Sequence, residues 1–293
     1  MVEGVVSLTK TFEARAKSPA KRRRLMPVSI ALCFFFLAIM VLMVLFGPLL
    51  APHDPQAQNA LAGSAGPSAE HWLGTDMLGR DVFSRLVSGA RSAISGPLVI
   101  AIGALVCGNI LGLLSGYRGG ILDFVIMRWV DLMVAMPSLL VIIVAAGALG
   151  GGYWMAVALL GVLSVPFDTR VIRAATLEQM PRPYVEAAKA LGVPNRRIMF
   201  LHIWPNIAAT AFANTFLVFA GSLIALSGLS FLGMGAEPGT PDWGQMLAEN
   251  QSLLFANPVA SIAPGVAIIL AATATNLIGD WTFEKISSRG ATR

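Results

Sequence analysis

Six long stretches of this sequence are almost free of charged residues, and they constrain the fold more than any other feature. The stretches are residues 28–50, 92–116, 129–152, 153–167, 207–236 and 258–279. A helix needs about 20 mostly apolar residues to cross a hydrocarbon core of about 30 Å. The sequence therefore predicts an all-α polytopic membrane protein with six transmembrane helices.

The boundary between the third and fourth stretches decides the number of spans. Gly150, Gly151 and Gly152 separate the two stretches, and glycine forms tight turns readily because it tolerates positive φ. The fourth stretch, 153–167, is short and needs these glycines to reach across the bilayer. The alternative is a five-span protein in which the two stretches form one helix.

Composition agrees with a membrane protein. The chain is 56% hydrophobic and 13% charged, whereas soluble domains carry about 25% charged residues. The first stretch has 23 residues, longer than the roughly 7–15 of a signal-peptide core, so it is predicted to be an uncleaved anchor. Cys33 and Cys107 lie inside apolar stretches, where they are expected to act as small apolar side chains and not as a disulfide.

Lysines and arginines predict the orientation of the spans. With six spans, 18 of these 21 residues fall in four segments, which are residues 1–27, 117–128, 168–206 and 280–293. Cytoplasmic segments carry an excess of lysine and arginine, so these segments and both termini are placed in the cytoplasm. The basic residues 1–27 are therefore read as a topology signal, and nucleic-acid binding is the less favoured alternative.

The middle of each stretch lacks ionisable residues. Proton- and ion-coupled carriers usually place such residues there, which counts against a secondary transporter. Arg128 and Asp131 lie three residues apart near the end of a stretch and are predicted to pair at the membrane interface. The amides and hydroxyls within the stretches are expected to join helices to each other. They are Asn109, Asn214, Thr215, Thr273 and Asn276.

Motifs for catalysis are also missing. The sequence has no G-x-x-x-x-G-K-S/T loop for phosphates, no Ser-His-Asp arrangement, and no Cys/His cluster with metal-ligand spacing. We therefore predict no catalytic residue, metal site or cofactor in this chain. Any ATP hydrolysis would have to take place on a partner protein.

The largest predicted cytoplasmic loop, residues 168–206, contains a short helix. Pro181 and Pro183 interrupt the chain, and the following residues, 184–191, are mostly good helix formers. Gly192 is a typical helix-ending glycine. The segment is suited either to docking in a partner's groove or to an ordinary place on the surface.

The same residues resemble the EAA signature of ABC importer permeases, which reads E-A-A-x3-G with I-x-L-P some dozen residues later. The resemblance implies the type I importer permease fold, with this segment as the coupling helix that sits in a cleft of a cytoplasmic ATPase. The implied coupling residues are Tyr184, Glu186, Ala187, Ala188, Leu191, Gly192 and Pro205. The sequence departs from the pattern at Trp204, where the family has leucine, and this leaves the packing of that segment open.

Other segments are similar to the dipeptide, oligopeptide and nickel permeases of the DppC/OppC kind. Residues 71–81, H-W-L-G-T-D-M-L-G-R-D, resemble the motif H-x-L-G-T-D-x-x-G-R-D, and residues 51–55 and 229–233 resemble A-P-H-D-P and L-S-F-L-G. The first motif is a turn that either ties the outer loop together or faces a docked binding protein. Its site residues are Gly74, Asp76, Gly79, Arg80 and Asp81. Leu226 replaces an acidic residue of the branch, which predicts an altered pathway lining.

The resemblance implies a permease subunit that imports di- or oligopeptides across the cytoplasmic (inner) membrane of a prokaryote. Its implied partners are a second, similar permease subunit, two ATPase subunits that bind ATP and Mg²⁺, and an extracytoplasmic solute-binding protein. Nickel or another small solute is the alternative substrate. A channel, a secondary transporter and a membrane-embedded enzyme are less favoured.

The predicted organisation has five consecutive parts. They are a basic segment (1–27), the first span (28–50), an extracytoplasmic loop (51–91), a five-helix permease core (92–281) that contains the coupling loop (168–206), and a cytoplasmic tail (282–293).

Overall fold

The computed structural model describes residues 27–290, and in this range the chain is helical. Most of the basic segment 1–27 lies outside the described residues. The helices are α2 (Val28–Leu50), α3 (Val82–Arg118), α4 (Gly120–Ala135), α5 (Ser138–Leu149), α6 (Tyr153–Gln179), α7 (Pro183–Ala190), α8 (Asn195–Arg197), α9 (Trp204–Phe231), α10 (Trp243–Asn250) and α11 (Pro258–Gly290). Residues 27–290 contain no β-strand, only an isolated bridge between Thr75 and Asp81. The all-α prediction is confirmed for this range.

Five helices are long and apolar enough to cross a membrane: α2, α3, α6, the continuous helix 195–231 that includes α9, and α11. α4 and α5 pass the same test as a pair, with a bend of 79° between them. With the pair counted as one broken span, the protein has the six predicted spans. Gly150, Gly151 and Gly152 all have positive φ, at 96°, 69° and 115°, and their turn separates α5 from α6, so the merged five-span helix does not form.

The shape predicted for the third span is wrong. The sequence predicts one spanning helix over residues 129–152, but the helix breaks between α4 and α5. Pro137 has no amide hydrogen and disfavours helical backbone at the residue before it. Met136 accordingly has an extended conformation, with φ −87° and ψ 129°.

Three helices, α3, α6 and α11, are longer than the apolar stretches that predict them. α3 begins at Val82, ten residues before the expected start, because Asp81 caps it by accepting a hydrogen bond from the Ser84 amide at 2.8 Å. α6 continues to Gln179, twelve residues past the expected end at 167. The extension of α3 is mostly buried in the protein, so charged and polar residues end an apolar stretch without ending the helix.

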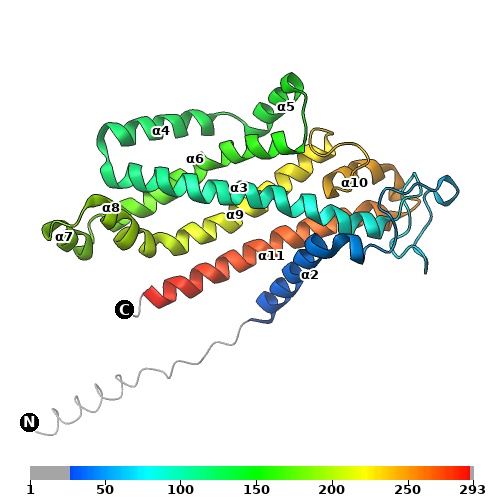
Figure 1. Cartoon of the computed structure of the whole chain (residues 1–293), viewed down its shortest axis with the longest axis horizontal. Helices are drawn as coiled ribbons and strands as arrows, with labels where there is room; N and C mark the ends of the chain where they lie inside the picture. The colour runs from blue at the N-terminus through cyan, green and yellow to red at the C-terminus, as the bar shows by residue number, and fades with distance from the viewer. Residues whose placement is uncertain (1–26, 291–293) are drawn as a thin grey trace, which may run out of the picture.

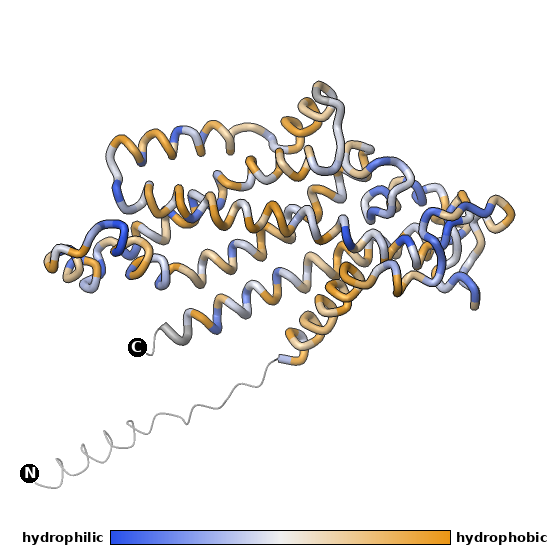
Figure 2. The backbone as a smooth tube through the Cα atoms, in the orientation of Figure 1, coloured by the Kyte–Doolittle hydropathy of each residue, from blue (hydrophilic) through white to orange (hydrophobic). Residues whose placement is uncertain are grey.

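The long helices α3, α6, α9 and α11 form an elongated bundle, and α2 contacts α3 and α11 (Figure 1). α7 and α8 lie at one end of this bundle, which we call the α7 end. α10 and the loop 51–81 lie at the opposite end, the α10 end. Hydrophobic residues predominate along the helices, and hydrophilic residues gather at both ends (Figure 2). This distribution suits a bundle whose middle lies in lipid.

The largest helix interface joins α3 to α6, and three glycines make it close. Gly108, Gly112 and Gly116 recur every fourth residue and so lie on one face of α3. A Cβ atom at Gly112 would lie 2.7 Å from the Cβ of Ile172 and 2.9 Å from the carbonyl oxygen of Thr169. The two backbones can approach this closely only because α3 has no side chains on this face.

We expect Gly112→Ala to destabilise the protein by about 1–3 kcal/mol, because the added methyl group overlaps α6 and forces the two helices apart. Gly103→Ala is the matched control, since it lies on the same helix and its Cβ would meet no atom within 4 Å. Thermal unfolding of both variants in detergent measures the effect. Equal melting temperatures would contradict the packing argument.

Candidate functional site

α7 and its ends have the conformation that the sequence predicts. The helix covers Pro183–Ala190, and Gly192 follows it with φ +70°. The amide of Gly192 donates to the carbonyl of Lys189 at 3.0 Å, and the amide of Val193 donates to the carbonyl of Ala188 at 3.1 Å. These two bonds form a Schellman motif, which satisfies the last carbonyls of the helix and needs a residue with positive φ.

α7 has an anchored face and a free face. Val185 and Ala188 are buried in an apolar cluster with residues of α3, α6 and the segment 198–211. On the other face Glu186 and Ala187 are exposed, and Leu191, just after the helix, is 82% exposed. Some of the predicted coupling residues therefore attach α7 to the bundle, and the others are exposed to the surroundings.

Polar contacts also tie this region to the long helices. The Tyr117 hydroxyl at the end of α3 donates to Asn195 Oδ1 at 2.9 Å, and Lys189 Nζ lies 5.6 Å from the centroid of the Tyr117 ring. The Tyr184 hydroxyl donates to Gln179 Oε1 of α6 at 3.0 Å. Burial raises the pKa of Tyr184 above its usual value, so the phenol stays protonated and keeps this bond. α7 is thus linked to both α3 and α6.

The structure shows how Trp204 packs. A π-helical turn, Ile198–Ile203, leads directly into α9, and Pro205 lies in the first turn of α9, as predicted. Trp204 Nε1 donates to Asn109 Oδ1 of α3 at 3.2 Å, and its ring makes an edge contact with Phe212. Asn109 therefore joins two helices, in agreement with the sequence prediction.

The other polar residues of the spans behave differently from one another. The Asn214 side chain of α9 donates to Asp168 of α6 and so joins two helices as predicted. Thr215 instead donates to the Ala211 carbonyl within its own helix at 2.9 Å. Asn276 lines an open groove between α6, α9 and α11. Leu226 of α9 is buried in an apolar cluster with residues of α3, α5 and α6. Its effect on the pathway lining stays a prediction.

The predicted ion pair between Arg128 and Asp131 is also wrong. Asp131 Oδ1 accepts from Arg170 Nη2 of α6 at 2.7 Å, because α4 packs along α6 and offers a partner from the neighbouring helix. One turn away, Arg173 donates two hydrogen bonds of 2.6 Å to Asp123. Two ion pairs thus connect α4 to α6 near the α7 end.

The motif residues at the α10 end fold into a tight turn. Gly74 and Gly79 have φ of 76° and 70°, and a Cβ at Gly79 would lie 1.8 Å from the Asn59 carbonyl oxygen. Asp76 accepts hydrogen bonds from the Arg80 amide at 3.0 Å and from Arg80 Nε at 2.6 Å. Asp76, Arg80 and Asp81 are all buried, so these side chains bind within the chain and do not face the surroundings.

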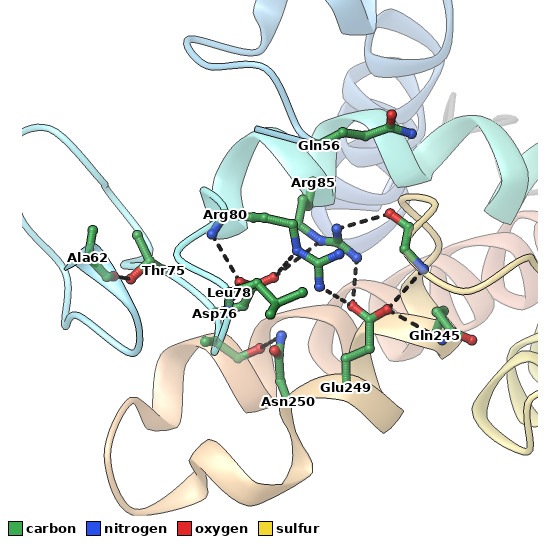
Figure 3. Close-up of polar contacts among 12 residues, drawn as sticks. Gln56, Ala62, Thr75, Asp76, Leu78, Arg80, Arg85, Gln245, Glu249 and Asn250 are labelled. Carbon is green, nitrogen blue, oxygen red and sulfur yellow. Dashed lines mark hydrogen bonds and ion pairs between the residues drawn. The ribbon is translucent and has the colours of Figure 1, made fainter. Parts of the chain in front are cut away.

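A buried charge network extends from this turn to α10 (Figure 3). Glu249 Oε2 accepts from Arg80 Nη2 at 2.6 Å and from Arg85 Nη2 at 2.8 Å. The Arg80 and Arg85 side chains are only 4% and 1% exposed, and the Glu249 side chain is 21% exposed. The network fixes the loop 51–81 and the start of α3 to a helix that lies far along the chain.

Sequence reasoning did not identify Arg85 and Glu249 as site residues. Arg85 lies only four residues past the end of the motif, and Glu249 lies in α10, far along the chain. One signal could have identified them. An arginine that lies among apolar residues of a helix needs an acidic partner when it is buried.

We expect Glu249→Gln to destabilise the protein by about 3 kcal/mol, because it leaves two buried guanidinium groups without their shared carboxylate. Glu70→Gln is the matched control, since it makes the same chemical change at an exposed residue of the loop 51–81. Thermal unfolding of the purified proteins is the measurement. Similar melting temperatures for the two variants would show that the network contributes little to stability.

Most of the chain matches two known protein-family models. Residues 108–289 match the family described as the binding-protein-dependent transport system inner membrane component. Residues 31–67 match the N-terminal transmembrane domain of oligopeptide transport permease C. The second match covers most of α2 and the start of the following loop.

Three curated relatives match most of the chain. The dipeptide transport system permease protein DppC of Alkalihalophilus pseudofirmus is 37% identical over 82% of this chain and 79% of its own length. The probable D,D-dipeptide transport system permease protein DdpC of Escherichia coli K12 is 36% identical over 83% and 82%. The glutathione transport system permease protein GsiD of Pectobacterium atrosepticum is 35% identical over 84% and 82%.

A solved structure shares the fold. A chain from the inward-facing conformations of the MetNI methionine ABC transporter aligns with a TM-score of 0.58, at 19% identity, over 70% of this chain and 97% of that chain. The ABC importer permease fold implied by the EAA resemblance is therefore confirmed. The chain belongs to the family of binding-protein-dependent transport system inner membrane components, in its DppC/OppC-like branch.

Proposed function

We propose that this chain is one of two membrane-spanning subunits of an ABC importer for short peptides in a prokaryotic inner membrane. The observation that carries the proposal is α7, a short helix anchored on one face and free on the other. The substrate class rests on relatives whose names specify dipeptides, D,D-dipeptides and glutathione. All of these are peptides of two or three residues.

In this proposal the α7 end is cytoplasmic and the α10 end faces outward. The support is the charge distribution of the sequence, since 18 of the 21 lysines and arginines fall in the four segments predicted to be cytoplasmic, and one of these segments, 168–206, contains α7. The solute-binding protein would then dock at the α10 end. There the buried charge network of Arg80, Arg85 and Glu249 holds the loop in one conformation.

Two ATPase subunits would bind and hydrolyse ATP with Mg²⁺, and the permease subunits would bind no nucleotide. The exposed Ala187 and Leu191 would enter an apolar cleft of one ATPase. Because Val185 and Ala188 pack against the long helices, closure of the ATPases would move α7 together with these helices. The bundle would thereby tilt between inward-open and outward-open states.

The groove around Asn276 is the candidate pathway lining in this subunit. It lies between α6, α9 and α11 and is lined by uncharged side chains, among them Ser164, Ser222 and Asn276. An uncharged lining does not select for the charge of a peptide side chain. Selection would therefore lie mainly with the binding protein, and a second, similar permease subunit would complete the pathway.

Changing Leu191 to aspartate tests the docking surface. We expect Leu191→Asp to lose co-purification of the ATPase subunits and to abolish peptide uptake, because it places a charge in an apolar contact. Leu191→Met keeps an apolar side chain and should retain both. The measurement is pull-down of the complex from membranes, with uptake of a labelled dipeptide. Normal ATPase binding by Leu191→Asp would show that the exposed face around Leu191 is not the docking surface.

Gly192 tests whether the turn after α7 must keep its geometry. Gly192→Val places a β-branched residue at φ +70°, which costs about 1–2 kcal/mol, so we expect α7 to shift and uptake to fall several-fold. Asparagine tolerates this conformation, and Gly192→Asn should transport nearly normally. Uptake is compared at equal amounts of protein in the membrane, and unchanged uptake by Gly192→Val counts against coupling through this turn.

A further inference from the structure

Three side chains that can bind a metal converge at the α10 end. His53 follows the end of α2, His71 lies in the middle of the loop, and Asp81 caps α3. One ligand atom from each lies within 4.8 Å of the other two. Sequence spacing predicted no metal site, because separations of 18 and 10 residues fit no common metal motif. The fold of the loop, not the spacing, brings the three together.

The distances in this cluster suit a zinc ion. His71 Nδ1 lies 3.0 Å from Asp81 Oδ1, and His53 Nδ1 lies 3.8 Å from Asp81 Oδ2. Zinc binds nitrogen and oxygen at about 2.0–2.2 Å, so ligand atoms of a tetrahedral site lie roughly 3.3–3.5 Å apart. The two nitrogens face different oxygens of the Asp81 carboxylate, so the carboxylate and the His53 ring must rotate to bring both nitrogens into this range around one oxygen. The three ligand atoms start within 4.8 Å of one another.

One nitrogen of the cluster has no partner. His53 Nδ1 is buried and makes no hydrogen bond, although it points toward the Asp81 carboxylate. A buried polar atom without a partner costs about 1–3 kcal/mol. A metal ion between the two side chains would satisfy this nitrogen, and would replace the hydrogen bond of 3.0 Å between His71 Nδ1 and Asp81 Oδ1.

Neighbouring hydrogen bonds hold the three residues in place. Ser84 donates to Asp81 Oδ2 from its amide at 2.8 Å and from its hydroxyl at 2.6 Å. The His53 amide donates to Ser84 Oγ at 3.1 Å, and the His71 amide donates to Ser68 Oγ at 3.0 Å. Such outer contacts orient metal ligands and lower the cost of forming a site.

We propose that His53, His71 and Asp81 bind one zinc ion, with a fourth position left for water. Two imidazoles and a carboxylate favour zinc over magnesium or calcium, which prefer oxygen ligands. The His53 and His71 side chains are 36% and 18% exposed, so the ion can enter from the surroundings. The bound ion links the end of α2 to the start of α3.

The test is a titration of the full-length protein, purified through a tag that contains no histidine. We expect Co²⁺ to bind with one equivalent per chain and to produce the visible absorption of a tetrahedral site. Zn²⁺ should displace it and raise the melting temperature, and Mg²⁺ should do neither. Absence of a stoichiometric Co²⁺ signal in the wild-type protein would overturn the proposal, whatever the variants do.

Variants locate the ion. His71→Gln and His53→Gln should each weaken Co²⁺ binding by about 100-fold or more, since loss of a ligand costs at least as much as loss of an outer contact. His202→Gln is the matched control, because it removes the one remaining histidine of the chain, at the α7 end. Equal affinity in the wild type and in both cluster variants would place the metal elsewhere. Binding does not depend on transport, so this result is independent of the proposed function.

Discussion

The close contact between α3 and α6 is the interaction on which the rest of the structure depends. Lipid offers no hydrophobic driving force between helices, so membrane helices associate through close packing. Gly112, with a glycine one turn away on each side, lets α6 approach the backbone of α3. α3 then connects the two ends of the molecule, because it begins beside the loop 51–81 and its last turn carries Tyr117, which contacts Lys189 of α7 and Asn195 of α8.

The two ends are stabilised in different ways. At the α10 end buried charges dominate, and Glu249 joins two arginines that have almost no exposure. Breaking such a network is costly, so this end is suited to keeping one conformation. At the α7 end Val185 anchors a helix whose other face, near Leu191, is open. A helix that is anchored by apolar contacts on one face and exposed on the other can bind a partner protein and move together with it.

Sequence reasoning succeeded where the cause is local. Apolar stretches predicted the spans, and the glycines at 150–152 and 192 marked turns that do have positive φ. It failed where the cause lies in a neighbouring helix. Asp131 pairs with Arg170 of α6 and not with Arg128 of its own helix, because an interhelical partner cannot be read from spacing along one helix. The break before Pro137 could have been predicted, since proline disfavours helix at the preceding residue.

The sequence by itself determined the helical class, the number of spans, the position of α7 and the family resemblance, because hydropathy, proline, glycine and short motifs act over a few residues. Only the tertiary structure decided which polar groups meet. Glu249 reaches Arg80 across 169 residues, and His53, His71 and Asp81 converge through the fold of one loop. Such pairings depend on how helix ends come together in space, and residue spacing carries no information about that.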